Sequence, residues 1–465
     1  MRATMAGNHH TTRWKANRGE KKMDLKKLLS GSVAGLAVLI SLASLSSAQS
    51  DPLYIQFSPS AVKGALYQPD PPQPAPQVGI LVIHRTSNVM GSLTCTELAK
   101  RGFMVLCMNP RSDNNEALVI WETLALDVRS GVNFLRKQPG ITKVLLLGGS
   151  GGGPTMSFYQ AVAENGPSYC QGSNKIIQCS NALSGLPPAD GIIFRDAHPG
   201  NPVIAGVRNI NPAVVNDSAV IDHNRPPRIN PRLDPFDEKN GYNPSGPSKY
   251  SDQFKNAYFK GQAERMNRLI DLALERLHEI EASDNPDDDA PFIIPRGDSA
   301  KIFQLDLSIL HSTVNPQKLL KNDGTISTQI VESVRVAAPE IAELNRTFNG
   351  GTLFLTVRSF LTANAVRGTN SLDGIDHCSS NNSTVCAVQK ISVPVLFGAM
   401  QGHYFIRDNE IHYELSASAD KDLIVIEGAT HGITPCTECE QFPGQYSNTV
   451  KNFFDYVAAW VNDRF

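Results

Sequence analysis

A single serine stands among five glycines in the segment LLLGGSGGGPTMSFYQA, residues 145–161. The run KVLLL at 143–147 is short and apolar, as a buried strand is, and the residues after the glycines fit a helix from about Pro154 to Ala163. Three chemistries use a glycine-rich turn in this context. They are a dinucleotide-binding loop, a phosphate-binding loop and a turn that presents a catalytic nucleophile.

The spacing of the glycines excludes the first two chemistries. The dinucleotide fingerprint G-x-G-x-x-G places its last glycine on Pro154 in one register and its second glycine on Ser150 in the other. The phosphate loop requires a lysine after its last glycine, and none follows here. The nucleophile elbow G-x-S-x-G fits residues 148–152, because its strained turn needs small residues two positions before and after the serine. Ser150 is therefore the candidate nucleophile, and the alternative is an inert serine in a glycine-rich turn.

Strands and helices alternate along much of the chain. Short apolar runs predict strands at 78–84, 103–108, 143–147, 191–194, 393–397 and 423–426. Helices are predicted at about 94–101, 122–137, 154–163 and 447–461. This alternation is typical of an α/β fold, in which helices cover both faces of a mostly parallel sheet.

The segment from 201 to 385 departs from this alternation. Its first part, to about residue 246, is rich in Pro, Asn and Asp, and a strongly amphipathic helix is predicted at 254–280. We expect a mainly helical cap, inserted after the sixth strand and folded over the C-terminal edge of the sheet. The predicted organisation is a first core segment at 49–200, a cap at 201–385 and a second core segment at 386–465.

The N-terminus has the pattern of a secretory signal peptide. Four lysines between positions 21 and 27 precede an apolar run from Leu28 to about Leu45, and the small residues Ser46-Ser47-Ala48 follow. We expect residues 1–48 to be removed, with residues 1–22 as an upstream extension because Met23 is a more typical start. The alternative is an uncleaved anchor, for which a Ser-, Gly- and Ala-rich run of about 18 residues is marginal. The prediction is a secreted or periplasmic protein without a further membrane-spanning segment.

Export affects the interpretation of the eight cysteines. An even number in an oxidising compartment predicts disulfides. Proximity in the sequence predicts three pairs and leaves a fourth, between a predicted helix and the next strand. The C-x-x-C at 436–439 is a weaker metal candidate, because no second pair of metal-binding residues accompanies it. The predicted disulfides are Cys170–Cys179, Cys378–Cys386, Cys436–Cys439 and Cys95–Cys107.

With these motifs, the chain resembles the α/β-hydrolase family over about 50–200 and 390–465. The elbow serine is one element of the resemblance. The run His84-Arg85-Thr86 follows a predicted strand, where the family has His-Gly-x. The run GATHG at 428–432 follows the last predicted strand, where the family places its histidine. Arg85 departs from the family's glycine and makes this oxyanion loop atypical.

The resemblance implies roles for four residues. Ser150 would be the nucleophile, and His431 would accept its proton, because imidazole has an ordinary pKa near neutral pH. The backbone amides of Gly151 and Thr86 would form the oxyanion hole that stabilises the tetrahedral intermediate.

The sequence offers three candidates for the carboxylate that would orient His431. Most of the family carries it shortly after the strand at 393–397, and the candidates in that region are Asp408 and Glu410. Some members, including certain haloalkane dehalogenases, carry it after the preceding strand, where this chain has Asp196. We favour Asp196, since Asp408 also fits the N-cap of the helix that follows it.

Three further residues have less specific predicted roles. Arg195 offers Asp196 an ion pair as an alternative to a triad role. His198 and His403 each follow a predicted strand, so both are candidates to line the pocket.

The activity implied is hydrolysis of carboxylic esters through an acyl-enzyme on Ser150, His431 and Asp196. Lipase, lactonase, polyester hydrolase and peptidase are alternatives on the same triad, and a lyase or a catalytically silent binding protein is an alternative of another class. A formal net charge of −2 gives no reason to expect nucleic acid or an anionic membrane as a partner. The expected partner is a small or polymeric ester, with no cofactor and no metal, and no motif specifies an oligomeric state.

Overall fold

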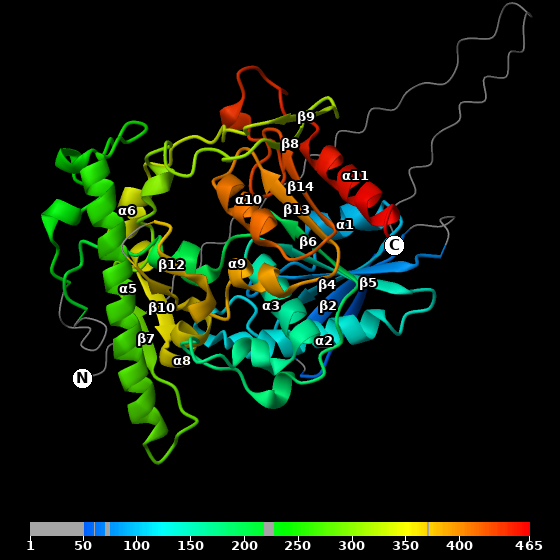
Figure 1. Ribbon diagram of the computed structural model, residues 1–465, viewed down its shortest axis with the longest axis horizontal. Coiled ribbons are helices and arrows are strands. Elements are labelled where there is room, and N and C mark those ends of the chain that lie inside the picture. Colours follow the sequence, from blue (N-terminus) through cyan, green and yellow to red (C-terminus); the bar gives the residue numbers. More distant parts are fainter. Residues whose placement is uncertain (1–50, 60, 70–74, 218–226, 370–371) are drawn as a thin grey trace, which may run out of the picture. The chain divides into compact units, whose positions relative to one another are not determined.

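Ten strands form one sheet (Figure 1). In spatial order the strands are β1 (Leu53–Gln56), β2 (Lys63–Tyr67), β4 (Met104–Asn109), β3 (Val78–Ile83), β5 (Lys143–Gly149), β6 (Gly191–Arg195), β13 (Val395–Met400), β14 (Lys421–Ile426), β8 (Gln317–Leu320) and β9 (Ile326–Gln329). In this order, every neighbouring pair from β4 to β8 is parallel, whereas the β1–β2, β2–β4 and β8–β9 pairs are antiparallel. The mostly parallel sheet predicted from the sequence is therefore confirmed.

This computed structural model describes residues 51–465 except 60, 70–74, 218–226 and 370–371. The predicted signal peptide, residues 1–48, lies outside the described residues. Within the described ranges, no helix has both the length and the apolar character needed to cross a bilayer.

Helices cover both faces of the sheet because its central strands are apolar on both sides. In β3, Leu81 and Ile83 belong to one apolar cluster, and Ile80 and Val82 belong to the other. Successive residues of a strand point to opposite faces, so a strand buried on both sides must be apolar throughout. Helices α2 (Trp121–Leu135), α3 (Gly152–Asn165) and α10 (Ile406–Leu415) pack on the first face, and α1 (Leu93–Ala99) and α11 (Thr449–Asn462) pack on the second.

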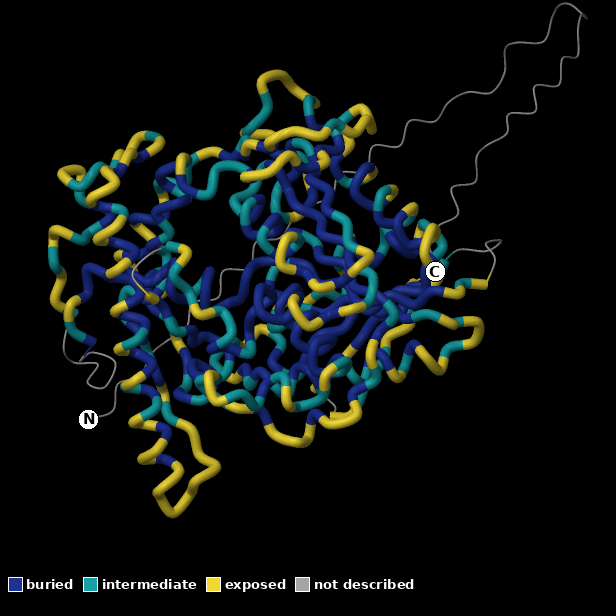
Figure 2. Tube along the Cα trace, viewed as in Figure 1, coloured by how far each residue is buried: buried dark blue, intermediate teal, exposed yellow. Residues whose placement is uncertain are grey.

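The mostly parallel sheet with helices on both faces and the strand–turn–helix unit at Ser150 agree with the fold expected from the sequence. Strands β1 and β2 were not predicted from the sequence. Strand β1 is mostly exposed at the sheet edge, and β2 carries a glycine, so neither has the apolar run of a central strand. Figure 2 shows the burial of the central strands beside the exposed loops.

A long helix dominates the region between β6 and β13. Helix α5 (Asp252–Glu281) begins where the Ser251 side chain accepts a hydrogen bond from the Phe254 amide, at 3.2 Å. Its apolar face, which includes Met266 and Leu269, packs on the antiparallel pair β7 (Pro291–Ile294) and β10 (Leu353–Thr356). The amphipathic helix predicted at 254–280 is confirmed. The remaining short elements are α6 (Ile341–Arg346), α7 (Phe348–Gly351), α8 (Val357–Ser359), β11 (Arg367–Gly368), β12 (Ile375–Asp376) and α9 (Thr384–Ala387).

The predicted cap boundaries need one correction. Strand β8 pairs parallel with β14, and β9 pairs antiparallel with β8, so residues 317–329 extend the main sheet. The predicted cap at 201–385 is therefore interrupted by a piece of the core. The apolar part of β8 is only Leu319-Leu320, which is too short to indicate a strand without its partner.

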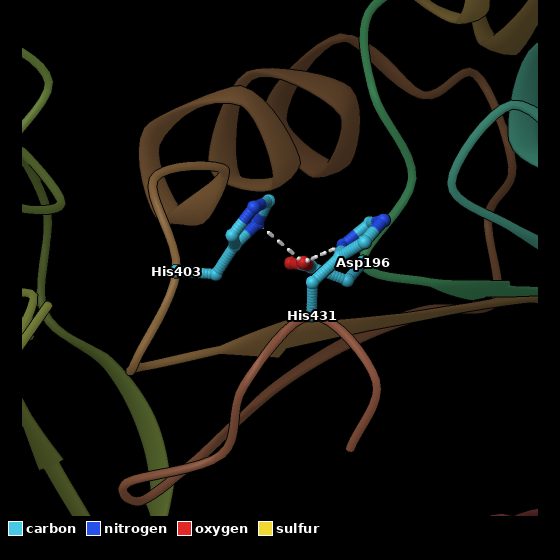
Figure 3. A group of neighbouring side chains, drawn as sticks. All are labelled: Asp196, His403 and His431. Carbon is cyan, nitrogen blue, oxygen red and sulfur yellow. Dashed lines mark hydrogen bonds and ion pairs between the residues drawn. The ribbon is translucent and has the colours of Figure 1, made fainter. Parts of the chain in front are cut away.

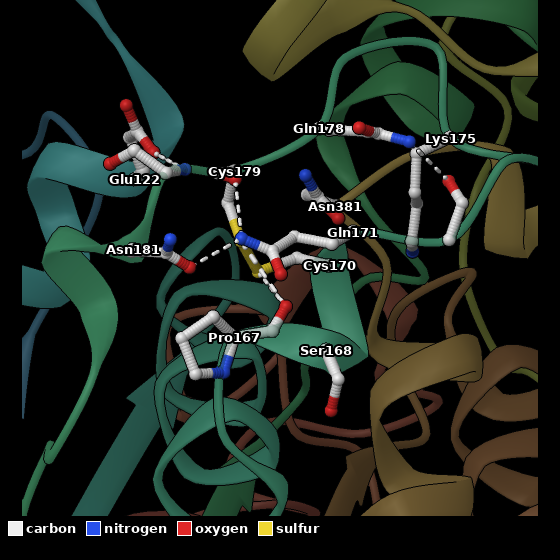
Figure 4. Close-up of a disulfide and its surroundings, with 12 residues drawn as sticks. Glu122, Pro167, Ser168, Cys170, Gln171, Lys175, Gln178, Cys179, Asn181 and Asn381 are labelled. Atoms are coloured by element: carbon white, nitrogen blue, oxygen red, sulfur yellow. Dashed lines mark hydrogen bonds between the residues drawn. A yellow bond between two sulfur atoms is a disulfide. The ribbon is translucent and has the colours of Figure 1, made fainter.

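Four disulfides join the cysteines in the predicted pairs, three of them predicted from proximity and Cys95–Cys107 as the remaining pair. Cys95–Cys107 connects α1 with β4, and Cys170–Cys179 closes the loop after α3. Figure 4 shows the second of these, where the Gln171 side chain donates a hydrogen bond to the Cys179 carbonyl at 3.1 Å. The other two pairs are Cys378–Cys386 and Cys436–Cys439.

Candidate active site

Ser150 lies on the sharp turn between β5 and α3. Its φ is 52°, a left-handed conformation that is uncommon for a residue with a side chain. A Cβ on Gly148 would lie 2.4 Å from the carbonyl oxygen of Gly152, and one on Gly152 would lie 2.5 Å from that of Ile83. Both clashes are with backbone, which cannot rotate away as a side chain can. The glycines two positions before and after the serine therefore meet the steric demand of the turn.

Asp196 and His431 meet at the carboxyl end of the parallel strands. Asp196 directly follows β6, and His431 lies in the loop after β14. His431 Nδ1 and Asp196 Oδ2 are 2.6 Å apart. Asp196 is fully buried, and the Met400 amide of the neighbouring strand β13 donates to its Oδ1 at 3.3 Å. The carboxylate is thus held by the sheet, in the kind of contact that orients a catalytic histidine.

A second histidine contacts the same carboxylate oxygen (Figure 3). His403 Nδ1 lies 2.7 Å from Asp196 Oδ2, and its ring stacks on that of His431 with the ring centroids 4.4 Å apart. From the sequence, His403 was predicted only to line the pocket. Its contact with Asp196 was not predicted, because the sequence does not show that the loop after β13 folds back over the end of β6.

The electrostatics of this cluster keep Asp196 ionised. Burial raises the pKa of Asp196, but the charges and hydrogen bonds of His403 and His431 outweigh burial and lower the pKa to about 2. Burial lowers the pKa of His403 to about 4, although the Asp196 carboxylate acts in the opposite direction. Near neutral pH, His403 is therefore uncharged, and the negative charge of Asp196 is available to stabilise a protonated His431.

Ser150 and His431 line one pocket of about 290 Å³. Its walls come from β3, from the loop between β3 and α1, and from the ends of β5 and β6, with apolar residues such as Val82, Val89 and Leu147. Arg195 is part of the same wall. The pocket is therefore built from the sheet and its loops.

The predicted oxyanion donors differ in how they are placed. The Gly151 amide stands at the N-terminus of α3, where backbone N–H groups lack an acceptor within the helix. The Thr86 amide instead donates to the His84 side chain, with 3.2 Å between the amide nitrogen and Nδ1, as the Ser87 amide does at 2.9 Å. The Thr86 amide thus shares His84 Nδ1 as an acceptor with the Ser87 amide, whereas the Gly151 amide has no such side-chain acceptor among the described residues.

The side chains of His84 and Arg85 both lie beside Gly151. Arg85 Nη2 lies 3.1 Å from a carboxylate oxygen of Glu116, and Arg85 Nη1 is buried without a hydrogen-bond partner among the described residues. A Cβ on Gly151 would lie 3.0 Å from this Nη1. The residue that departs from the family's glycine thus brings an unpaired N–H donor next to the elbow.

The two alternative carboxylates do not contact His431. Asp408 forms a buried ion pair with Arg208, at 2.9 Å, in the first turn of α10. It is not the N-cap of that helix, which is Phe405, so this part of the sequence interpretation was wrong. Glu410 accepts hydrogen bonds from the amides of Val314 and Asn315, both at 2.8 Å. Asp408 therefore ties α10 to the segment that carries Arg208, and Glu410 ties it to the residues before β8.

His198 lies behind the turn and does not line the pocket. It is buried, its amide is 3.5 Å from the Ser150 carbonyl oxygen, and its ring packs edge-on against Phe405. Burial lowers its pKa well below the usual range, with the charge of Arg85 acting in the same direction. The prediction that His198 lines the pocket is therefore not met.

Among the described residues, Asp196, His403 and His431 are the one group of three His, Cys, Asp or Glu side chains whose donor atoms all lie within 4.8 Å of one another. Donor atoms that share one Zn²⁺ lie about 2.0–2.2 Å from the ion, so they stand more than about 3 Å from each other. Here the Asp196 oxygen is 2.6 Å and 2.7 Å from the two histidine nitrogens. These are hydrogen-bond distances, so this arrangement does not fit an ion held between the three atoms.

The Cys436–Cys439 disulfide directly follows the loop that carries His431. The Cys436 amide donates to the Gly428 carbonyl at 2.8 Å, and the Gly402 amide donates to the Ala429 carbonyl at 2.8 Å. The same segment therefore braces the loop with His431 and the loop with His403.

Replacing both Cys436 and Cys439 with alanine is expected to affect activity more than stability. The bond spans a sequence separation of 3, so the chain-entropy model assigns it only about 2 kcal/mol of stabilisation of the folded state. A displaced His431 should nevertheless lower turnover by about tenfold or more. Thermal unfolding and steady-state kinetics check this, with the double alanine variant of Cys170 and Cys179, on the loop after α3, as control. Free thiols at 436 and 439 in exported protein, mapped without reduction, would remove the premise.

Comparison with known proteins finds similarity only at the level of solved structures. No family model and no curated protein matches the chain. A hypothetical protein from Pseudomonas aeruginosa is 13% identical, with 90% of this chain and 95% of that chain covered and a TM-score of 0.42. Est1E from Butyrivibrio proteoclasticus is 10% identical (89% and 98% covered, TM-score 0.36), and a soluble variant of monoglyceride lipase from Saccharomyces cerevisiae is 13% identical (89% and 94% covered, TM-score 0.35). These values are too low to carry an activity over to this chain.

Proposed function

We propose that this protein is a serine hydrolase that cleaves carboxylic esters through an acyl-enzyme. The observation that carries the proposal is the 2.6 Å contact between His431 and Asp196, beside a serine that shares a pocket with His431. A nucleophile, a base and a carboxylate that orients the base are the three parts of a catalytic triad. Here they come from the ends of three strands, β5, β14 and β6, which share one edge of the sheet.

The tautomer of His431 follows from its contact with Asp196. An ionised carboxylate only accepts hydrogen bonds, so Nδ1 of His431 carries the proton and Nε2 has a free lone pair. In the proposed first step, Nε2 removes the Ser150 proton as Oγ attacks the ester carbonyl. The imidazolium then gives this proton to the alkoxide that leaves, and the acyl group stays on Ser150. In the second step, His431 activates a water molecule that releases the acid.

The negative oxygen of each tetrahedral intermediate needs donors close to the serine. The Gly151 amide at the start of α3 is the first. The second donor that we propose is Arg85 Nη1, in place of the Thr86 amide, since this N–H is buried beside Gly151 and unpaired. A charged donor would stabilise an oxyanion more strongly than a neutral amide.

Other activities of the same triad remain as second candidates. A lipase or polyester hydrolase needs room for a long or polymeric chain, and a pocket of about 290 Å³ favours a small group. We also propose that the protein acts outside the cytoplasm, because four disulfides suit an oxidising compartment.

A fluorophosphonate probe tests the proposal without knowledge of the substrate. The probe reacts with a serine only where a base activates it, so we expect one label per molecule, on the peptide that contains Ser150. Mass spectrometry of the digested protein locates the label, and Ser150→Ala protein should carry none. If wild-type protein with an intact fold remains unlabelled, the chain is a binding protein with an inert serine.

A further inference from the structure

Arg195 is a charged residue in the pocket that the proposed triad does not use. It is the last residue of β6, directly before Asp196, and its side chain lines the pocket with Ser150 and His431. Successive strand residues point to opposite sides. Arg195 therefore enters the pocket on the side of α1, where its Nη1 is 3.4 Å from the Thr94 hydroxyl.

The guanidinium of Arg195 lacks the partners that a structural arginine has. Its Nε is buried without a hydrogen-bond partner, and no carboxylate of the described residues forms an ion pair with it. Its neighbour Asp196 is engaged with two histidines. A charged group is costly to enclose unless it is paired, so this position calls for a negative partner.

Two buried arginines, compared with the partly exposed Arg195, show what a structural role requires in this chain. Arg265 pairs with Asp217 at 3.0 Å and donates to the carbonyls of Asn211, Arg296 and Pro295. Arg335, whose Nε is also unpaired, donates through its two Nη atoms to four backbone carbonyls. Arg195 has a single, long contact with a hydroxyl. The difference is that Arg195 faces a pocket and the other two face backbone.

The guanidinium also lies close to the reacting serine. A Cβ on Gly149, the residue before Ser150, would lie 2.4 Å from both Nε and Nη2 of Arg195. Because Gly149 has no side chain, the Arg195 guanidinium can occupy this space. A group bound by Arg195 would stand within a few bonds of an ester carbonyl at Ser150.

We propose that Arg195 binds a carboxylate of the substrate, so that the enzyme prefers short esters that carry a negative charge near the scissile bond. The planar guanidinium matches one carboxylate through two parallel N–H···O bonds. The small size of the pocket agrees with a short acid and disagrees with a long acyl chain. This inference rests on the proposed ester hydrolysis and specifies its substrate class.

Paired esters that differ only in charge test the inference. Mono-4-nitrophenyl glutarate carries a terminal carboxylate, and 4-nitrophenyl pentanoate has the same chain length without it. We expect wild-type protein to have a kcat/KM at least about tenfold higher for the charged ester. Arg195→Met should lower kcat/KM for the charged ester by about 10²-fold, mainly through KM. Its kcat/KM for the neutral ester should stay within about threefold of the wild-type value. Arg195→Lys should fall between, because it keeps the charge and loses the fork.

A matched control is Arg129→Met, which removes the same charge from α2 on the other face of the sheet. This variant should leave kcat/KM for both esters unchanged. Equal rates of wild-type protein on the two esters would overturn the inference. So would an Arg195→Met variant that loses both activities equally, since Arg195 would then act in catalysis or in folding. Where Arg195→Met does not fold, the ester preference of wild-type protein and of Arg195→Lys decides.

A binding measurement separates this inference from the proposed hydrolysis. Calorimetry with free glutarate and Ser150→Ala protein should detect binding, and the same variant with Arg195→Met should show none. Hydrolysis of the neutral ester without glutarate binding would remove the anion site and leave the hydrolase. Glutarate binding that depends on Arg195, without hydrolysis of either ester or probe labelling, would remove the hydrolase and support the anion site alone.

Discussion

Ser150→Ala and His431→Ala are each expected to abolish nearly all ester hydrolysis while the protein stays folded. The expected loss in turnover is about 10⁶-fold, the size seen when a serine hydrolase loses its nucleophile or base. The remaining rate would come from the oxyanion donors and from substrate binding. Alanine at 150 removes only the Oγ atom, so thermal unfolding should change little.

The losses from these two substitutions should not add. The nucleophile and its base act as one unit, so the double variant should be about as slow as either single variant. Ser157→Ala is a suitable control, because Ser157 is a buried serine of α3 whose hydroxyl donates only to the Pro154 carbonyl, at 3.2 Å. It should keep almost full activity. Substantial hydrolysis by well-folded Ser150→Ala protein would contradict the mechanism.

Asp196→Asn is expected to lower turnover by about 10⁴-fold. An asparagine NH₂ in place of Oδ2 donates a hydrogen bond, so His431 Nδ1 must accept it and the proton moves to Nε2. The histidine then presents a proton where the serine needs a base. Packing should change little, because asparagine has the shape of aspartate. Kinetics at saturating ester, together with a thermal unfolding curve, measure both effects.

Asp408→Asn and Glu410→Gln are the matched controls for this prediction. Asp408 pairs with buried Arg208, so its loss should destabilise the protein, since breaking a buried ion pair on one side costs about 3–5 kcal/mol. Turnover per folded molecule should remain close to that of wild-type protein for both variants, because neither acid contacts His431. The assignment of Asp196 is wrong if turnover collapses in one of these variants and survives in Asp196→Asn.

Local rules were enough to predict the elbow from the sequence. A serine with small residues on both sides, between an apolar strand and a helix, indicates a nucleophile turn, because the clashes at Gly148 and Gly152 arise within one turn of chain. The alternation of strands and helices and the pairing of cysteines close in sequence are local in the same sense. The apolar face of α5 was visible for the same reason, since its periodicity lies within one helix.

Such local rules could not predict the contacts between segments that are distant in the sequence. Three acids were compatible with the order of strands, and the choice among them depends on how β6, β13 and the loop after β14 come together at the sheet edge. Strand β8 is a strand because β14 lies beside it, and its own two leucines do not show that.

The polar groups around the candidate site illustrate the same limit. The 2.6 Å contact of Asp196 with His431 joins residues 235 positions apart, and the contact with His403 joins residues of two neighbouring strand ends. The sequence placed Arg195 at the end of a strand but did not show that its guanidinium enters the pocket without a partner. Sequence alone determined which turn can present a nucleophile, because that depends on sterics between adjacent residues. Only the tertiary structure determined which charges surround it, because burial and pairing arise when distant segments pack together.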